Sequence, residues 1–426
     1  MRAVVLAAGR GVRLQPLTLT KPKCMLPVGG SPLLKWVFKA LKKAGVREAL
    51  TILNPEGWKA KGFLDGSKLG LKVSYTRDNN PKGTGSSLTL AEPFVKNRVF
   101  LAVYGDLYLS PSMVKGFLEE GLKRIKEGCQ AILAAVKVEN PREYGVVQVK
   151  GEGRVLKILE KPEKPRSNLA NAGIYLFKPE VFKAVRLVKP SPRGEIELTE
   201  AVNLLAEESE VYAVTIPGGG WLDIGRPWDL LEANRRVLSE MKGKVEGVVE
   251  SQVVLQGGVT VEKGATVCFG SVVEGPAFIG SGCEVGPFAR IRPYTSLGRN
   301  VRVGSFCEVK NSIVMDGSRI SHLCYVGDSI IGENCNLGAG TLLANLRLDE
   351  QPVKVEIKGV KVSSGLRKFG AVLGDGVKTA VNVSIMPGVK VGPRSLIGPV
   401  LTVSRDIPAD TLVAGMQRLD FKPVKG

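Results

Sequence analysis

A single histidine stands in this chain of 426 residues, within the stretch RISHLCYVGD at residues 319–328. Free imidazole has a pKa of about 6.5, which makes it the side chain best suited to move a proton at neutral pH. A lone histidine in a repetitive sequence is nevertheless more often a corner or surface residue than a catalyst. His322 is therefore a candidate general base whose role depends on its neighbours.

A glycine-rich turn follows the first apolar run of the chain. In LAAGRGVRLQPLTLTKPKCMLPVGG, residues 6–30, Gly9 and Gly11 let backbone N–H groups approach a phosphate. Arg13 and Lys23 add fixed positive charge to the same string. Position 14 is leucine, so the string is not the G-x-G-x-x-G fingerprint of dinucleotide binders. The pattern favours a phosphate-binding loop and disfavours dinucleotide binding.

The elements that must hold this loop alternate between strand and helix over residues 1–235. Apolar runs predict strands at RAVVLAAG (2–9), VREALTIL (46–53) and RVFLAVYGDLYL (98–109), and helical spacing predicts helices at 33–45 and 112–128. This alternation is typical of an α/β domain with a mostly parallel sheet. A further helix, residues 227–243, is expected to join this part to the rest of the chain.

The second part of the chain, residues 236–426, has a different period. Aliphatic residues recur at every sixth position from Val249 to Val309, and glycine follows several of them. The register slips by one near Ile313 and near Ile331, and it returns from Ile385 to Val403. Such a repeat stacks into a triangular coil and predicts a left-handed parallel β-helix. Residues 346–371 break the pattern with several lysines and arginines and are expected to form a basic projecting loop.

The string at residues 6–30 resembles the signature of the sugar-1-phosphate nucleotidyltransferases. Other strings follow that family in order: PKGTGSSL (81–88), VYGD, EKP, NAGIYLF and WLDIG. The resemblance covers essentially all of residues 1–235 and implies a Rossmann-like domain. A sugar-1-phosphate oxygen would attack the α-phosphorus of a nucleoside triphosphate and release pyrophosphate, a reaction driven mainly by positioning and charge neutralisation.

The same resemblance implies residue roles. Arg13 and Lys23 would be catalytic, and Asp106 and Asp223 would bind Mg²⁺, which prefers oxygen ligands. Asp78 stands where the family often has glutamine, so the nucleobase stays open between UTP and dTTP. The expected nucleotide contacts are Leu6, Ala8, Gly9, Gly11, Asp78, Gly83 and Thr84, and the expected sugar-phosphate contacts are Gly145, Glu160, Lys161 and Asn171.

Residues 286–345 resemble, without gaps, the acetyltransferase domain of the bifunctional N-acetylglucosamine-1-phosphate uridyltransferases. His322 would take the proton from the amine of glucosamine-1-phosphate, or of galactosamine-1-phosphate, as that amine attacks acetyl-CoA. The strings ANLR (344–347) and SSGLRK (363–368) look more like archaeal two-activity proteins, although Gln351 stands where those tend to have lysine. The implied sugar-phosphate contacts are Arg292, Lys310, Tyr325, Asn336, Asn345 and Lys354. The resemblance also implies a homotrimer with acyl-transfer sites between neighbouring coils.

Composition narrows the remaining classes. The net charge of +19 has no long basic run and no interleaved aromatics, which disfavours nucleic acid and favours phosphorylated ligands. Seven cysteines without CxxC or Cys/His spacing argue against a disulfide framework and a zinc site. No membrane segment or signal peptide is expected, so a cytoplasmic protein is predicted.

Two other readings stay open. One is a nucleotidyltransferase alone, such as a relative of mannose-1-phosphate guanylyltransferase, with a structural β-helix. The other is a regulatory subunit like those of translation-initiation exchange factors. The candidate groups in the β-helix disfavour the first reading, and the presence of Arg13, Lys23, Asp106 and Asp223 disfavours the second.

Overall fold

The computed structural model describes residues 1–59, 61–63 and 70–416. Their contacts divide the chain into two compact units. The first unit holds Met1–Gly11, Lys21–Leu26 and Ser31–Gly225. The second holds Val12–Thr20, Pro27–Gly30 and the chain from Arg226 onward. Two short N-terminal segments therefore pack with the C-terminal half of the chain.

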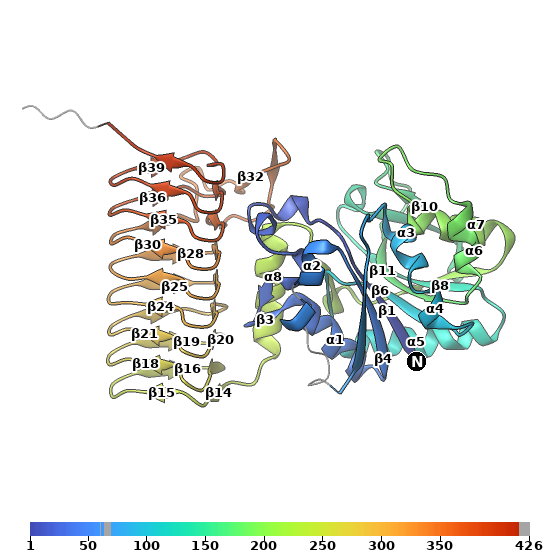
Figure 1. Ribbon diagram of the computed structural model, residues 1–426, viewed down its shortest axis with the longest axis horizontal. Coiled ribbons are helices and arrows are strands. Elements are labelled where there is room, and N and C mark those ends of the chain that lie inside the picture. The colour runs from blue at the N-terminus through green and yellow to red at the C-terminus, as the bar shows by residue number, and fades with distance from the viewer. Residues whose placement is uncertain (60, 64–69, 417–426) are drawn as a thin grey trace, which may run out of the picture. The chain divides into compact units, whose positions relative to one another are not determined.

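A nine-stranded sheet is the centre of the first unit, in the order β5-β4-β1-β6-β11-β8-β12-β10-β9 (Figure 1). Its inner strands are mostly buried and mostly apolar, as expected for a sheet covered on both faces. The strands are β1 (Arg2–Ala7), β4 (Glu48–Leu53), β5 (Lys72–Arg77), β6 (Phe100–Tyr104), β8 (Ala131–Lys137), β9 (Gly145–Lys150), β10 (Arg154–Glu160), β11 (Leu169–Phe177) and β12 (Val211–Thr215).

This sheet is more mixed than the sequence predicts. Strands β5, β4, β1 and β6 run parallel, but β11 is antiparallel to both β6 and β8. Strands β9 and β10 form an antiparallel pair that leads directly into β11, so no helical crossover reverses the chain there. The expected single strand at 98–109 is also wrong, because it breaks at Gly105 and Asp106 into β6 and β7 (Leu107–Leu109).

Helices cover both faces of the sheet. The hydrophobic cluster on one face includes residues from α1 (Leu33–Lys43) and α5 (Pro111–Lys126), the two helices expected from the sequence. The cluster on the other face includes residues from α3 (Thr84–Thr89), α4 (Glu92–Val95), α6 (Val181–Leu187) and α7 (Leu198–Glu208). The shorter elements are η1 (Val12–Leu14), η2 (Leu17–Leu19), η3 (Lys23–Met25), β2 (Pro27–Val28), β3 (Ser31–Pro32), α2 (Pro55–Lys59), η4 (Lys61–Phe63), η6 (Pro141–Glu143), η7 (Gly218–Gly220) and β13 (Trp221–Asp223).

The second unit is built on a left-handed parallel β-helix whose rungs stack from β15 to β39 (Figure 1). Each turn contributes one short strand to each of three parallel sheets, named here by their first strands. The β14 sheet holds β14 (Lys244–Val245), β17 (Val259–Val261), β20 (Ala277–Ile279), β23 (Ser296–Leu297), β26 (Ile313–Val314), β29 (Ile330–Ile331), β34 (Val372–Leu373) and β37 (Lys390–Val391).

The β15 sheet holds β15 (Val248–Val249), β18 (Thr266–Val267), β21 (Glu284–Val285), β24 (Arg302–Val303), β27 (Arg319–Ile320), β30 (Asn336–Leu337), β35 (Lys378–Thr379), β38 (Leu396–Ile397) and β40 (Leu412–Val413). The β16 sheet holds β16 (Val254–Gln256), β19 (Val272–Glu274), β22 (Arg290–Ile291), β25 (Glu308–Lys310), β28 (Tyr325–Gly327), β31 (Leu342–Leu343), β36 (Ser384–Ile385) and β39 (Thr402–Val403).

The six-residue repeat is confirmed as the inner ladder of this coil. The repeated aliphatic residues form one buried cluster that runs through the coil. Both predicted register slips are present, because Leu297 pairs with Val314 and Val314 pairs with Ile331. Aliphatic side chains at nearly all inward positions keep the interior free of unpaired polar groups, which is why the pattern survives the slips. The exception is Thr379, whose hydroxyl is bonded to that of Thr341 at 2.7 Å.

Two elements of the second unit lie outside the stacked rungs of the coil. The basic segment at 346–371 contains an antiparallel hairpin of β32 (Lys354–Ile357) and β33 (Val360–Ser363), which projects from the stacked rungs (Figure 1). Helix α8 (Pro227–Glu240) begins with proline, and Asp229 accepts a bond from the Arg226 amide at 2.7 Å. In the described ranges every helix is too short or too polar to cross a bilayer.

Candidate active sites

The phosphate-loop residues lie at the end of β1. Leu6 and Ala8 are buried, whereas Gly9 is exposed and a Cβ atom added there would meet nothing within 4 Å. Gly11 has a φ of 65°, in the left-handed region that favours glycine. Arg13 follows in η1, in a segment that packs with the second unit. The loop therefore leaves open space above Gly9 for a ligand.

Lys23 and Asp106 form an ion pair in the first unit. Lys23 is 8% exposed, and its Nζ contacts Asp106 Oδ2. The second oxygen, Asp106 Oδ1, is buried and has no hydrogen-bond partner among the described residues. A buried carboxylate oxygen without a donor is costly unless a ligand or cation satisfies it. Asp106 therefore presents an oxygen that is free to bind a cation.

Asp223 is brought next to Asp106 by strand pairing. Strand β13 pairs antiparallel with β7, so Asp223 lies opposite Leu107, and the Ile224 amide donates to the Asp106 carbonyl at 3.2 Å. The two expected carboxylates thus lie at adjoining strand ends, at the carboxyl edge of β6 where α/β sheets bind ligands. Within the described ranges no group of three or more histidine, cysteine or acidic residues could hold a metal. Substrate oxygens would have to complete a Mg²⁺ site here.

The expected base-contacting loop, residues 78–84, is fixed by hydrogen bonds at both of its ends. Asp78 is buried and accepts hydrogen bonds from Ser87 Oγ at 2.7 Å and the Asn80 amide at 3.1 Å. Gly83 has a φ of 110°, and a Cβ there would come within 2.6 Å of the Ile196 carbonyl oxygen. Thr84 Oγ1 accepts a bond from the Leu198 amide at 3.1 Å. Asp78 thus orders the loop through its own carboxylate.

The expected sugar contacts gather on β9, β10 and β11. Gly145 pairs with Glu160, and a Cβ at Gly145 would lie 3.1 Å from Glu160 Oε1. Glu160 Oε1 also accepts a bond from Thr199 Oγ1 at 2.9 Å. Asn171 donates to the Tyr175 hydroxyl at 2.6 Å. Lys161 follows Glu160 with a φ of 45° and is exposed.

Two side chains next to the expected sugar contacts, Tyr175 and Glu197, have shifted pKa values. Burial raises the pKa of Tyr175, whose hydroxyl also lies 3.2 Å from that of Tyr104. Burial, followed by a hydrogen bond with Glu195, raises the pKa of Glu197 to about 7, while Arg193 opposes the shift. Arg193 donates to Glu197 Oε1 at 2.7 Å. Sequence reasoning did not single out this carboxyl.

A second cluster lies in the coil, around Asp328. This residue is 5% exposed. Its carboxylate accepts hydrogen bonds from Asn311 Nδ2 at 2.7 Å and from Asn345 Nδ2, and it pairs with Lys310 Nζ at 3.3 Å. Three donors on neighbouring turns therefore converge on one buried charge. Asp328 was not among the expected site residues, and its only signal in the sequence is its place in the string YVGD.

Glycine at position 327 leaves room for this convergence. A Cβ there would lie 2.6 Å from both Asn345 Nδ2 and the Tyr325 hydroxyl. Asn345 donates to that hydroxyl at 3.2 Å. Burial, and then the negative charge of Asp328, raises the pKa of Tyr325. The structure thus brings Lys310, Tyr325 and Asn345 together.

Arg292 lies one turn before Lys310 on the same face. Its backbone amide donates to the Val309 carbonyl at 2.8 Å, and its NH1 pairs with Glu308 Oε1 at 2.8 Å. The Nε atom of Arg292 is buried and has no hydrogen-bond partner among the described residues. Two cations on successive turns, each held by a carboxylate, can receive a phosphate.

His322 lies at the corner between β27 and β28. It is exposed. Its carbonyl accepts a bond from the Gly340 amide at 3.1 Å, and the Leu323 amide donates to the Ser305 carbonyl at 3.2 Å. Ser305 and Ala339 thus occupy the same corner on the neighbouring turns. Their small side chains leave the imidazole accessible, three residues from Tyr325.

Two expected residues do not join this cluster. Asn336 lies on the β15 sheet, whereas Tyr325 and Lys310 lie on the β16 sheet. Lys354 is exposed on the hairpin strand β32. Gln351 is also exposed. Within one chain, the expected acceptor contacts are therefore divided among two faces and the hairpin.

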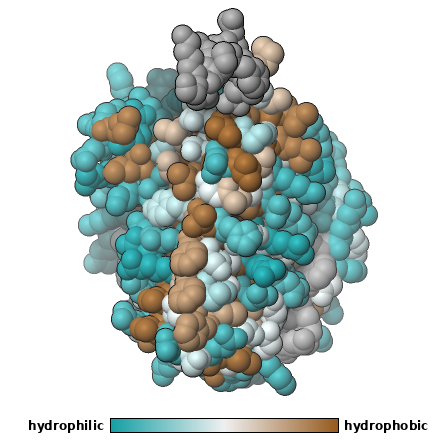
Figure 2. Space-filling view, turned by 90° about the vertical axis from the view of Figure 1, so that its left-hand side faces the viewer, coloured by the Kyte–Doolittle hydropathy of each residue, from teal (hydrophilic) through white to brown (hydrophobic). Residues whose placement is uncertain are grey.

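An apolar ridge follows the corner that carries His322. It is a row of exposed hydrophobic side chains along the turns of the coil, interrupted at the turn that carries Ala339 (Figure 2). Phe288 and Phe306 stack with ring centroids 5.7 Å apart, and Phe306 is 64% exposed. Leu323 and Val400 have φ values of 51° and 57°, which bulky residues rarely adopt. The ridge comprises Phe269, Phe288, Phe306, Leu323, Val381 and Val400.

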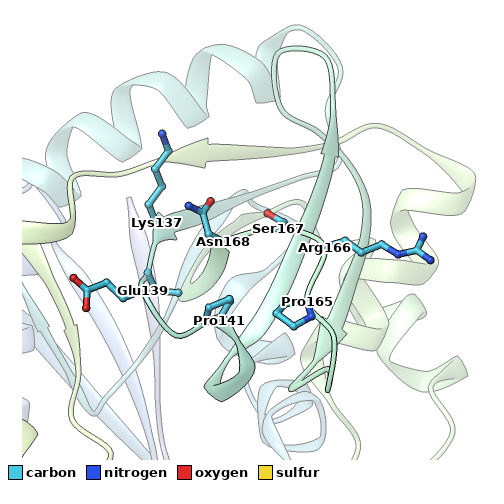
Figure 3. A pocket seen from close by; sticks show the side chains of 8 residues that line it. Lys137, Glu139, Pro141, Pro165, Arg166, Ser167 and Asn168 are labelled. Carbon is cyan, nitrogen blue, oxygen red and sulfur yellow. The ribbon is translucent and has the colours of Figure 1, made fainter. Parts of the chain in front are cut away.

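A separate hollow of about 640 Å³ lies beside the end of β8 in the first unit (Figure 3). It contains none of the expected site residues. Figure 3 shows Glu139 and Arg166 pointing away from one another. Its lining is Lys137, Val138, Glu139, Pro141, Pro165, Arg166, Ser167 and Asn168.

Known families match both parts of the chain. The nucleotidyl transferase family model matches residues 2–240, and the GMPPB C-terminal domain model matches residues 273–386. A solved structure also resembles the chain, that of a protein assigned as a glucose-1-phosphate thymidylyltransferase from Bacillus anthracis. It is 29% identical, with a TM-score of 0.52, and the match covers 57% of this chain and 98% of that one.

Two archaeal proteins match over nearly the full length. The chain is 42% identical over 425 residues to the protein named bifunctional protein GlmU of Methanocaldococcus jannaschii, with 100% of both chains covered. It is 40% identical over 414 residues to the bifunctional sugar-1-phosphate nucleotidylyltransferase/acetyltransferase of Sulfurisphaera tokodaii, which covers 96% of this chain and 98% of that one. The similarity therefore includes both units.

Proposed function

Because the chain belongs to the family of archaeal bifunctional sugar-1-phosphate nucleotidylyltransferase/acetyltransferases, we propose that it catalyses two reactions at two separate sites. The first transfers a nucleotidyl group from UTP or dTTP to N-acetylglucosamine-1-phosphate or glucose-1-phosphate. The second acetylates glucosamine-1-phosphate, or galactosamine-1-phosphate, from acetyl-CoA. Both reactions use co-substrates of central metabolism, which supports a cytoplasmic location.

The first reaction is supported by the Lys23–Asp106 pair and its neighbour Asp223. A phosphate oxygen of the sugar-1-phosphate attacks the α-phosphorus, and the bond to the pyrophosphate oxygen breaks. Lys23 would stabilise the negative charge that grows on the phosphates, and Arg13 would do the same from its own segment. The Lys23–Asp106 pair keeps the buried ammonium compensated before a nucleotide binds.

Mg²⁺ fits the donor set of this site. The unpartnered oxygen Asp106 Oδ1 and the carboxylate of Asp223 are the hard ligands that this ion prefers. When bound, Mg²⁺ would neutralise phosphate charge and polarise the α-phosphorus. The two carboxylates would then hold the ion, while Lys23 holds the triphosphate.

The second reaction is supported above all by the convergence of Lys310 and Asn345 on Asp328, with Tyr325 bonded to Asn345. This arrangement holds a cation and two polar groups rigidly on the coil surface, and a purely structural coil has no need of it. The substrate amine attacks the thioester carbonyl, a C–N bond forms, and the C–S bond breaks to release CoA. His322 would take the proton lost by the amine.

We also propose that the enzyme is a homotrimer joined along the apolar ridge. Left-handed backbone at bulky residues such as Phe306 and Leu323 costs about 1–2 kcal/mol each, which burial between copies would offset. Asn336 and Tyr325 lie on different faces of one coil. A neighbouring copy could supply Asn336 to the face that carries Tyr325, which would complete the acceptor site.

A nucleotidyltransferase with a purely structural coil is the second candidate function. The match of residues 273–386 to the GMPPB C-terminal domain favours it. The two candidates differ in one observable, the release of free thiol from acetyl-CoA with an amino-sugar phosphate.

The proposed nucleotidyl reaction is tested by pyrophosphate release. Wild-type protein should release pyrophosphate only with Mg²⁺, a sugar-1-phosphate and either UTP or dTTP present together. A panel of the other nucleoside triphosphates and sugar phosphates then defines the preference. If no combination of nucleoside triphosphate and sugar phosphate gives pyrophosphate release, the proposed nucleotidyl transfer is refuted, whether or not the coil has acetyltransferase activity.

A further inference from the structure

One amide in helix α8 joins two distant segments of the second unit. Asn234 is fully buried, with 0% exposure. Its Oδ1 accepts a hydrogen bond from the Gly29 amide at 2.8 Å, and its Nδ2 donates to the Tyr294 carbonyl at 2.9 Å. A buried amide with both ends satisfied fixes the position of its partners, because losing either bond would leave an unpaired polar group.

The segment Pro27–Gly30 is held by a second contact with the coil. A Cβ atom at Gly30, whose φ is 72°, would come within 2.0 Å of Phe278 Cε1. Phe278 is 5% exposed and lies on β20 of the coil. The ring therefore closes directly over the glycine backbone, and a side chain at position 30 cannot be accommodated there without movement of the ring.

The segment Val12–Thr20 is attached to the coil as well. Thr20 Oγ1 donates to Asp375 Oδ2 at 2.7 Å. The other oxygen of Asp375 accepts the Glu333 amide at 2.8 Å, so the carboxylate is itself fixed by the neighbouring turn. The chain on both sides of Lys21–Leu26 thus belongs to the second unit.

We propose that the coil unit positions Lys23 for nucleotidyl transfer by holding the chain on both sides of it, and that Asn234 is a positioning residue for that reaction. This inference rests on the proposed nucleotidyl transfer. Lys23 is buried and short segments join it to both anchored flanks, so slack in either flank changes where its ammonium lies. A displacement of about 1 Å at a catalytic group lowers turnover about a hundredfold.

The test compares Asn234→Leu with Ser318→Ala. Leucine has nearly the shape of asparagine but forms neither hydrogen bond. Ser318 is the matched control, because it is also fully buried and also makes two hydrogen bonds, to the Gly332 carbonyl and from the Cys335 amide. Both variants are assayed for pyrophosphate release, for thiol release and for the midpoint of thermal unfolding.

Asn234→Leu should lower kcat for pyrophosphate release about ten- to a hundredfold, with little change in the KM of the sugar phosphate and in thiol release. Ser318→Ala should leave both activities unchanged relative to the folded fraction. Equal losses of the two activities in Asn234→Leu, or unchanged pyrophosphate release in it, would overturn the proposal. A wild type without pyrophosphate release would instead refute the underlying function.

A second pair of variants keeps the test decisive if Asn234→Leu does not fold. Gly30→Ala should lower pyrophosphate release, because the new methyl group meets the Phe278 ring. Adding Phe278→Ala should restore part of that activity, since it removes the ring and leaves only the strain of alanine in the left-handed backbone at position 30. No recovery in the double variant, with normal thiol release in both, would contradict positioning through this contact.

Discussion

Replacing Asp328 by asparagine should weaken the binding of the acetyl acceptor. The two side chains have the same shape, but the amide has no charge and presents a donor where the carboxylate has an acceptor. In the structure the carboxylate accepts hydrogen bonds from Asn311 Nδ2 at 2.7 Å and from the Asn345 side-chain amide, and it forms an ion pair with Lys310 Nζ at 3.3 Å. The variant therefore turns at least one donor–acceptor contact into a donor–donor contact and leaves Lys310 without its counter-charge.

The size of the effect follows from these contacts. A hydrogen bond to a charged group contributes about 1.5–3 kcal/mol. If one such bond is lost and Lys310 and Asn345 are released from their fixed positions, that energy is lost from sugar-phosphate binding. It corresponds to a rise of about ten- to a hundredfold in the KM of the amino-sugar phosphate.

The assay is thiol release from acetyl-CoA with varied glucosamine-1-phosphate. The KM of acetyl-CoA and the rate of pyrophosphate release should stay near the wild-type values. Asp316→Asn is the matched control, because Asp316 lies on an adjacent turn but at another corner, where it binds Arg299. An unchanged KM of the amino-sugar phosphate in Asp328→Asn, or an equal rise in the control, would show that Asp328 does not order the acceptor site.

Three further predictions follow from the two units. Asp223→Asn and Lys23→Ala should each abolish pyrophosphate release and spare thiol release; loss of both activities in a correctly assembled protein would contradict separate sites. Phe306→Asp should convert the proposed trimer to monomers in a mass measurement and lower thiol release, and an unchanged mass would contradict assembly along the ridge. Glu197 has its pKa raised to about 7, above the ordinary 4.5, so the folded protein holds this proton more tightly than the unfolded chain. Its contribution to stability is therefore present at acidic pH and lost as the pH rises through about 7. Glu197→Gln should remove this fall in the thermal midpoint, and parallel pH profiles for both proteins would refute the assignment.

The coil could be predicted from the sequence because the aliphatic residues of its repeat are the residues buried inside it. A polar residue at an inward position needs a partner inside the coil, as Thr379 has in Thr341, so the aliphatic spacing persists even where the register slips at Val314 and Ile331. The cluster on Asp328 could not be predicted in this way. Its contacts join residues on different turns, and they depend on the absence of a side chain at Gly327.

The first unit was predicted less completely. Period and composition indicated the buried strands, but they carried no information on strand direction, so the antiparallel β11 was missed. The break at Gly105 and Asp106 was also missed, because the apolar run continues across it. Likewise, the packing of Val12–Thr20 and Pro27–Gly30 with the coil depends on contacts such as that of Gly29 with Asn234, which no local pattern reports.

We propose that this chain holds two separate active sites, the second of which depends on its single histidine. The most direct test is thiol release from acetyl-CoA with glucosamine-1-phosphate, measured for wild type and for His322→Ala, with pyrophosphate release followed in the same preparations. His322→Ala should lose thiol release and keep pyrophosphate release at the wild-type mass. Thiol release that persists in the variant, or that is absent from wild type beside normal pyrophosphate release, would contradict the proposal.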